Sequence, residues 1–228
     1  MLLPLLLIAS PLWLGAVPAD IVRRGPVEKK RVALTFDACS TGGPTGYDAA
    51  VIRALRDAKA PATLFLSGHW AESHPAETLE LAHDPLFELG NHAYVHPHMT
   101  RLSQARQRQE LSRTQQVLSQ ATGQAPRYFR PPYGEVNVEL ARVAAEEGLR
   151  TIEFDVASGD ADKSFKKERL TGWVLKEAKA GSIVVLHMNG RGWHTAEALP
   201  GIIEGLRARG FELAKVSDLL EAPEAKAP

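Results

Sequence analysis

Short apolar runs rich in β-branched and aromatic residues recur along this chain, and longer segments with an apolar residue every three or four positions separate them. The short runs predict strands, and the longer segments predict amphipathic helices. The predicted strands cover residues 31–36, 62–67, 88–92, 127–130, 149–154, 182–187 and 211–214. The predicted helices cover residues 47–58, 77–87, 103–120, 137–148, 168–179 and 195–208.

This alternation, with short connections, predicts a single-domain α/β fold of the (β/α)-barrel type with about seven parallel strands. In such a barrel the carboxyl ends of the strands meet on one face, where these folds place their chemistry. Polar residues suited to catalysis stand at the ends of the predicted strands or after them: Asp37, His92, Arg130, Asp155 with Asp160, and His187. We therefore expect these side chains to converge, although Asp155 and Asp160 have the alternative of capping loops.

The balance of charge limits the partners of this protein. The 228 residues contain 27 Lys and Arg against 27 Asp and Glu, so the formal net charge is zero. A nucleic-acid-binding protein normally carries a basic excess, so no nucleic-acid partner is expected. No feature of the sequence indicates an oligomeric state.

The amino-terminal segment predicts export. Residues 2–17 are apolar, and Val17 and Ala19 occupy the −3 and −1 positions of a cleavage site. We interpret residues 1–19 as a signal peptide and 20–228 as the mature domain, exported to the periplasm or secreted. A membrane anchor is the alternative, but Pro4 and Pro11 interrupt a short apolar run, so no stable membrane insertion is expected after cleavage.

Two histidines are the first candidate metal ligands. His92 and His96 are four residues apart, a spacing that suits two imidazoles on one metal ion when the backbone makes one turn between them. Surface histidine pairs also arise by chance, so the argument depends on their position after a predicted strand. Cys39 is the only cysteine, which excludes an intramolecular disulfide.

Two further motifs supply donors and an acid. In FRPPYG, Pro131 and Pro132 lack an N–H group, so the next backbone donor after Arg130 is the amide of Tyr133. A rigid turn that directs one N–H into a cleft suits an oxyanion site, whereas the alternative is an ordinary loop.

His187 ends the apolar run SIVVLH, and Asp160 is placed to orient its imidazole. The alternative for His187 is a hydrogen-bonded residue at the rim of the barrel. Taken together, a metal site, a carboxylate, an oxyanion donor and a histidine indicate metal-assisted hydrolysis of an amide or ester.

The segments TFDA, HAYVH, RPPY, DVASGD and VLH, in this order, resemble the five motifs of polysaccharide deacetylases. This family is also known as the NodB homology domain or carbohydrate esterase family 4, and the similarity runs from about residue 32 to 214. The resemblance implies a distorted (β/α) barrel and a divalent metal, with zinc favoured. It also implies removal of acetyl groups from peptidoglycan or chitin-like glycans, or from xylan.

The resemblance implies a role for each residue. Asp37 corresponds to the catalytic base, and Arg130 corresponds to the arginine that orients it. His187 corresponds to the general acid, and Asp160 corresponds to the carboxylate paired with it. The backbone N–H of Tyr133 corresponds to the oxyanion donor.

His92 and His96 correspond to two metal ligands, but the third is missing, because Ala38 stands where the family has an aspartate. Three explanations remain open: two histidines with water, replacement by the thiolate of Cys39, or a site that only binds glycan. Consecutive residues of a strand point to opposite faces. Cys39 can therefore be a metal ligand only if the chain turns after Asp37. Otherwise Cys39 is a small buried residue.

Two more positions depart from the family pattern. Ala161 replaces an aromatic residue that forms one wall of the substrate groove, and Met188 replaces a common acidic residue after the general acid. A complete set of acid and base residues has no role in core packing. We therefore favour an active deacetylase of an acetylated polysaccharide, with a catalytically impaired glycan-binding pseudoenzyme as the alternative.

Overall fold

The computed structural model describes residues 17–40 and 46–221. The predicted signal peptide lies outside the described residues except for its last three positions. Among the described residues, no helix combines the length and apolar character needed to cross a membrane.

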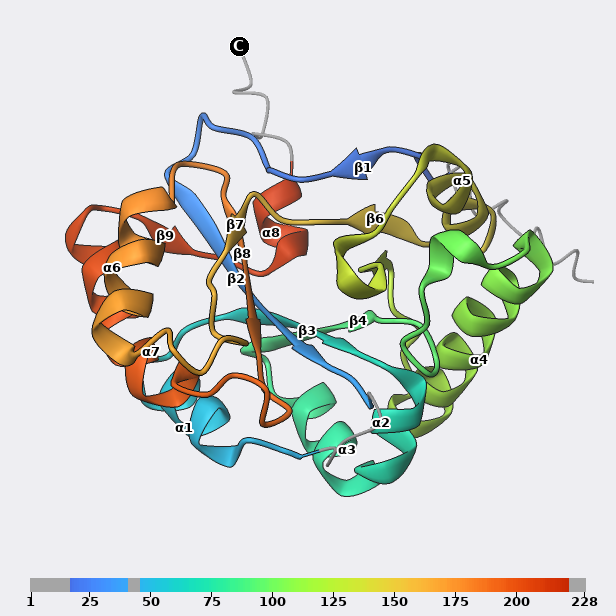
Figure 1. The fold of residues 1–228 in the computed structure, drawn as a ribbon, viewed down its shortest axis with the longest axis horizontal. Helices are drawn as coiled ribbons and strands as arrows, with labels where there is room; N and C mark the ends of the chain where they lie inside the picture. Colours follow the sequence, from blue (N-terminus) through green and yellow to red (C-terminus); the bar gives the residue numbers. More distant parts are fainter. Residues whose placement is uncertain (1–16, 41–45, 222–228) are drawn as a thin grey trace, which may run out of the picture.

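One curled, fully parallel sheet forms the centre of the molecule (Figure 1). Its strands follow the order β1-β6-β5-β4-β3-β2-β8-β7, and β9 pairs with the first part of β2. The bounds are β1 (Ile21–Val22), β2 (Arg31–Ala38), β3 (Ala62–Leu66), β4 (Phe87–Asn91), β5 (Tyr128–Phe129), β6 (Arg150–Ile152), β7 (Val156–Ala157), β8 (Ile183–His187) and β9 (Glu212–Leu213). The predicted α/β barrel of parallel strands is confirmed as an incompletely closed barrel.

Helices surround the sheet on its outer side, except the last one at residues 216–220, which packs against Ala33, Phe65 and Ile183 on the other face (Figure 1). Their bounds are α1 (Ala49–Asp57), α2 (Gly68–Ser73), α3 (Pro75–His83), α4 (Gln104–Thr122), α5 (Val138–Glu146), α6 (Lys167–Glu177), α7 (Thr195–Ala208) and α8 (Val216–Leu220). Side chains of the sheet pack against α1, α6 and α7 in the largest apolar cluster, which contains Phe36, Ile52 and Leu199. Burial of this cluster supplies the main driving force for the fold.

Local chemistry explains where several elements begin and end. The side chain of Asp48 accepts hydrogen bonds from the first backbone N–H groups of α1, and Asn137 does the same for α5. Gly123 ends α4 in the left-handed conformation, with a φ of 74°.

The register of the sheet brings distant parts of the sequence together. Asp37 of β2 is the direct partner of His187 on β8, and Leu66 of β3 is the partner of Asn91 on β4. Because all strands are parallel, the residues that follow them lie at one end of the sheet.

The structure also corrects details of the prediction. The helix predicted at 77–87 ends at His83, and Phe87 instead begins β4. Asp84 precedes Pro85, which disfavours helical geometry, and its side chain accepts a hydrogen bond from the N–H of Leu86. The sequence pattern missed β1, β7, α2 and α8, which have two to six residues each and are too short to show a period.

Candidate active site

A buried ion pair occupies the centre of the carboxyl end of the sheet. Asp37 is the penultimate residue of β2, and Arg130 directly follows β5. Arg130 Nη1 donates to Asp37 Oδ1 at 2.9 Å, and the guanidinium lies 4.2 Å from the centre of the Phe65 ring. Burial opposes ionisation of Asp37, but the charge and hydrogen bond of Arg130, together with His92 and His187, outweigh it, so the pKa of Asp37 lies below its ordinary value.

A second carboxylate fixes the imidazole of His187. His187 Nδ1 donates to Asp160 Oδ1 at 2.8 Å, while Asp160 Oδ2 accepts from the His187 backbone N–H and from Thr195 Oγ1, both at 2.7 Å. Burial opposes protonation of the imidazole, but Asp160 overcomes it and raises the pKa of His187. The arrangement leaves Nε2 to donate a proton to a substrate.

Three side chains form a candidate metal cluster next to Asp37. Potential ligand atoms of Cys39, His92 and His96 all lie within 4.8 Å of one another, and all three residues are buried. His92 Nε2 lies 3.7 Å from Asp37 Oδ2. In the part of the chain that the structure describes, no other group of three such residues comes together.

The chemistry of this cluster fits a divalent metal with nitrogen and sulfur ligands. His92 Nδ1 donates to the backbone carbonyl of Arg130 at 2.8 Å, so Nε2 carries the lone pair that a metal requires. His96 Nδ1 is buried without a hydrogen-bond partner among the described residues. The potential ligand atoms lie within 4.8 Å of one another, compared with an edge of about 3.5 Å in a zinc tetrahedron.

The neutral forms of these residues dominate when no cation compensates for burial. Burial lowers the pKa of His96 to about 3 and raises that of Cys39 to about 11. A neutral imidazole is the form that ligates a metal, whereas the thiol must lose its proton on coordination.

Cys39 lies two residues after Asp37, directly after the end of β2, and its sulfur is within 4.8 Å of a ring nitrogen of His92 and of His96. That the chain turns after Asp37 stays a prediction. Ala38, between them, is fully buried in the main apolar cluster. The sulfur also lies 3.5 Å from Asn189 Nδ2.

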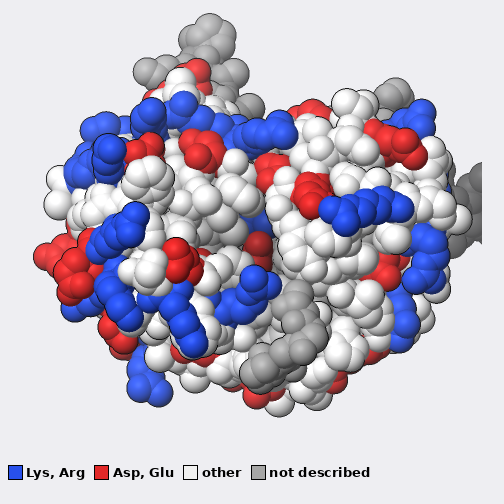
Figure 2. Space-filling view, in the orientation of Figure 1, with Lys and Arg blue, Asp and Glu red and all other residues white. Residues whose placement is uncertain are grey.

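A cavity of about 470 Å³ opens onto these groups, with Asp37, His96, Tyr133, Asp160 and His187 among its lining residues. In Figure 2 it is the hollow near the middle of the view. The Tyr133 ring is half-exposed and stacks on His98, with centroids 4.2 Å apart. Among the described residues, four non-glycine residues have positive φ: His96 and Tyr133 line the cavity, and Ala93 directly follows His92. Such backbone strain is typical of functional loops.

Comparison with known proteins identifies the family of this chain. A family model described as polysaccharide deacetylase matches residues 24–152, more than half of the chain. The chain belongs to the polysaccharide deacetylase family. The resemblance read from the five sequence motifs is thus confirmed at the level of the family.

Individual relatives include both enzymes and a pseudoenzyme. The chain is 28% identical over 200 residues to a peptidoglycan-N-acetylglucosamine deacetylase of Bacillus cereus, covering 86% of this chain and 70% of the relative. Two other curated relatives are longer, and the chain spans 51% and 31% of their lengths.

Among solved structures, BA3943 of Bacillus anthracis, described as a CE4 family pseudoenzyme, superposes with a TM-score of 0.81 at 29% identity, covering 90% of this chain and 70% of that one. A mutant of BA3943 is described as having restored enzymatic activity. A family 4 carbohydrate esterase of Streptomyces lividans, in complex with acetate, has a TM-score of 0.69 at 35% identity, covering 79% and 90%.

Met188, Ala161 and Asp155 lie in three different environments. Met188 is fully buried in the main apolar cluster, and its backbone N–H donates to the Asp37 carbonyl at 3.1 Å. Ala161 is exposed at the cavity. Asp155 lies outside the site, because its carboxylate accepts from Ser182 Oγ and from the N–H of Ile183 at the start of β8.

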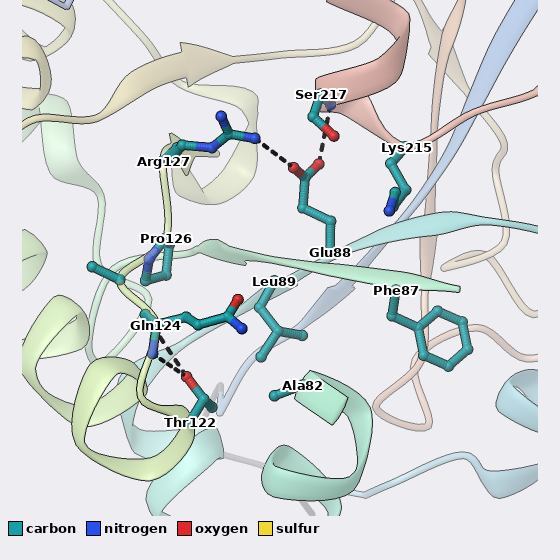
Figure 3. A pocket seen from close by; sticks show the side chains of 11 residues that line it. Ala82, Phe87, Glu88, Leu89, Thr122, Gln124, Pro126, Arg127, Lys215 and Ser217 are labelled. Carbon is teal, nitrogen blue, oxygen red and sulfur yellow. Dashed lines mark hydrogen bonds and ion pairs between the residues drawn. The ribbon is translucent and has the colours of Figure 1, made fainter. Parts of the chain in front are cut away.

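A second, smaller pocket lies at the opposite end of the sheet, beside the start of β4 (Figure 3). Its partly buried carboxylate, Glu88, accepts from Thr63 Oγ1 at 3.0 Å and from the N–H of Ser217 at 3.1 Å, and Arg127 lies 3.7 Å away. These contacts attach α8 to the sheet. The cavity of about 470 Å³, which Asp37 and His187 line, is therefore the candidate active site.

Sequence reasoning missed Glu153, a buried carboxyl group behind the ion pair. Its backbone carbonyl accepts from Arg130 Nη2 at 3.4 Å, and its Oε1 has no hydrogen-bond partner in the described part of the chain. Burial raises the pKa of Glu153 to about 7, although Arg130 partly offsets this. No sequence signal distinguishes it from a surface glutamate, because it follows a short strand with no clear period.

We expect Glu153→Gln to stabilise the protein at pH 8. The ordinary pKa of 4.5 rises to about 7 on folding, so the stability of the wild type falls as pH increases between these values. Each pH unit in this window costs about 1.4 kcal/mol at most, so the variant should gain about 2–3 kcal/mol at pH 8. Urea unfolding across pH 4–8 measures this gain.

The control is Glu168→Gln on the exposed side of α6, which should change stability little. A Glu153→Gln variant that is no more stable than the wild type at pH 8 contradicts the burial of a neutral carboxyl group.

Proposed function

We propose that this protein is a metal-dependent hydrolase that removes acetyl groups from an N-acetylated, or O-acetylated, polysaccharide. The observation that carries the proposal is the convergence of Asp37, Arg130 and the His187–Asp160 pair on one cavity beside the Cys39–His92–His96 cluster. The structure of a family 4 esterase with bound acetate, the product of deacetylation, is consistent with it.

The side chains of this protein have complementary roles in the proposed reaction. Asp37, kept ionised by Arg130, accepts the proton of the attacking water. The backbone N–H of Tyr133 donates to the oxygen that becomes negatively charged as the water adds. His187 then gives its Nε2 proton to the leaving amine or alcohol, and Asp160 stabilises the imidazolium before transfer.

Cys39, His92 and His96 would hold the metal, and sulfur with two imidazole nitrogens is a ligand set that suits zinc. When bound, a zinc ion acidifies water and polarises the acetyl carbonyl. Asp37 does not belong to the cluster but adjoins it through His92. This position suits a base that receives a proton from water held at the cluster.

The substrate proposed is peptidoglycan or a chitin-like glycan. Relatives in Bacillus cereus and Bacillus subtilis are named as deacetylases of peptidoglycan sugars. Those names agree with the export expected from residues 1–19, because peptidoglycan lies outside the cytoplasm. We therefore place the proposed activity in the periplasm or outside the cell.

Acetate release tests the proposal. Purified protein loaded with zinc should release acetate from chitooligosaccharides, peptidoglycan fragments or acetylxylan, and a chelator should stop the release until zinc is returned. Release that persists without a divalent metal contradicts metal dependence. No acetate from any of the three substrates contradicts the enzymatic function.

Two observations favour a second candidate, a glycan-binding protein without turnover. Ala38 removes the third ligand of the family pattern, and BA3943 shows that a close structural match to this fold can be a pseudoenzyme. This candidate predicts saturable glycan binding with no acetate release and no effect of Asp37→Asn on affinity.

We expect Asp160→Asn to reduce kcat by about 10²- to 10⁴-fold, the usual contribution of a general acid. Loss of the carboxylate lowers the pKa of His187, which Asp160 now raises. The decline of the rate at high pH should therefore shift to lower pH. Rate measurements from pH 5 to 9 test the shift, and an unchanged profile contradicts the assignment of His187 as the acid.

A further inference from the structure

Two loops bonded to each other form the wall of the cavity on the side of α6 and α7. One connects β7 to α6 and contains Asp160, and the other connects β8 to α7 and contains Trp193. The backbone N–H of Trp193 donates to the backbone carbonyl of Asp160 at 3.0 Å, and Lys166 Nζ lies 3.3 Å from His194 Nε2. The wall is therefore a connected unit attached directly to the His187–Asp160 pair.

Trp193 presents an exposed indole at the outer edge of this wall. It is 48% exposed, and Lys163 Nζ lies 3.9 Å from the centre of its ring, a cation–π contact. Ala161, which lines the cavity nearby, stands where the family pattern has an aromatic residue. An exposed indole on a loop that also lines the cavity offers an apolar face to a ligand.

The same wall is locally basic although the chain is neutral overall. Between residues 161 and 169, four exposed cations accompany two exposed carboxylates, Asp162 and Glu168. The cations are Lys163, Lys166, Lys167 and Arg169. Figure 2 shows Lys and Arg side chains gathered on the α6 and α7 side of the hollow. A local positive potential favours a ligand with negative charge.

We propose that Trp193 and Lys163 form an outer sugar subsite that selects glycans bearing carboxylates. The inference rests on the proposed function, since it places the acetylated sugar in the cavity and a neighbouring sugar on the wall. The indole contacts the apolar C–H face of that sugar, and the Lys163 ammonium pairs with its carboxylate. The subsite thus supplies an aromatic contact that Ala161 cannot.

A pair of probes that differ only in charge tests the proposal. One is a tetrasaccharide of alternating N-acetylglucosamine and N-acetylmuramic acid with free lactyl carboxylates, and the other is its methyl ester. Binding is measured by calorimetry with the full chain carrying Asp37→Asn, so that the probes stay intact. We expect the acid to bind roughly fivefold tighter than the ester at low salt, with the difference shrinking as salt rises.

Variants separate the two contacts. Trp193→Ala should weaken binding of both probes roughly tenfold, whereas Trp193→Phe should retain most of the affinity. Lys163→Gln should remove the preference for the acid and leave the ester unaffected. Lys176→Gln is the matched control, because Lys176 is exposed on α6 and also lies over a tryptophan, Trp173, at 5.6 Å.

Equal affinity for acid and ester, or unaltered binding by Trp193→Ala, overturns the subsite. Acetate release by the wild type is measured separately. A preference for the acid without any acetate release refutes the enzymatic function and leaves the subsite standing. Acetate release without such a preference refutes the subsite alone.

Discussion

Replacement of Asp37 by asparagine should reduce kcat/KM for acetate release by about 10³-fold, within the range that a general base contributes. The amide keeps the shape of the side chain and can still accept a hydrogen bond from Arg130, which now donates at 2.9 Å. It cannot accept the proton of the attacking water. A coupled assay for acetate on a chitooligosaccharide measures the loss.

Two control measurements attribute the loss of activity to the missing carboxylate of Asp37. Zinc content should stay at the wild-type level, since Asp37 lies outside the Cys39–His92–His96 cluster. Asp57→Asn, on the exposed surface of α1, is the control and should retain activity. An Asp37→Asn variant with more than about a tenth of wild-type activity contradicts the role of base, which normally contributes at least 10²-fold.

Loss of Arg130 should have the largest effect on stability. The side chain is fully buried and pairs with a buried carboxylate. Arg130→Met leaves the Asp37 charge without its partner, and removal of one member of a buried pair costs about 3–5 kcal/mol. Urea unfolding at pH 7 measures this loss, and activity should fall with it because the pKa of Asp37 rises.

A double variant distinguishes the ion pair from simple loss of packing. Asp37→Asn combined with Arg130→Met should recover part of the stability, because no uncompensated charge remains. Arg150→Met is the matched control, since Arg150 pairs with Asp20 near the surface at 2.7 Å and should cost about 1 kcal/mol or less. Additive losses in the double variant contradict an energetic coupling of Asp37 and Arg130.

The sequence predicted those parts of the fold that repeat a strong local pattern. The apolar run before Asp37 and the helical period at 195–208 match β2 and α7 closely. Elements as short as β7 and α8 depend on pairing and packing with distant segments. They are too short to show a hydrophobic period from which they could be predicted. The boundary between α3 and β4 was misplaced because the apolar residues Leu86 and Phe87 continue the helical pattern across the Asp84–Pro85 break.

The residues of the candidate site also fall into those that a local pattern predicts and those that only tertiary contacts reveal. Residues at the carboxyl ends of long strands, such as Asp37 and His187, could be placed at one end of the sheet because parallel strands share that end. Glu153 and Thr195 could not, since their importance comes from contacts with Arg130 and Asp160 that only the tertiary structure creates.

The spectrum of the cobalt-substituted protein tests most directly whether Cys39, His92 and His96 hold one cation beside the base. A thiolate ligand gives cobalt(II) an intense charge-transfer absorption in the near ultraviolet, which imidazole and carboxylate ligands do not. One equivalent of cobalt(II) should produce this absorption in the wild type and in Asp57→Asn, and Cys39→Ser should abolish it. An absorption that is absent from the wild type, or that survives Cys39→Ser, contradicts a metal centre built on this cysteine.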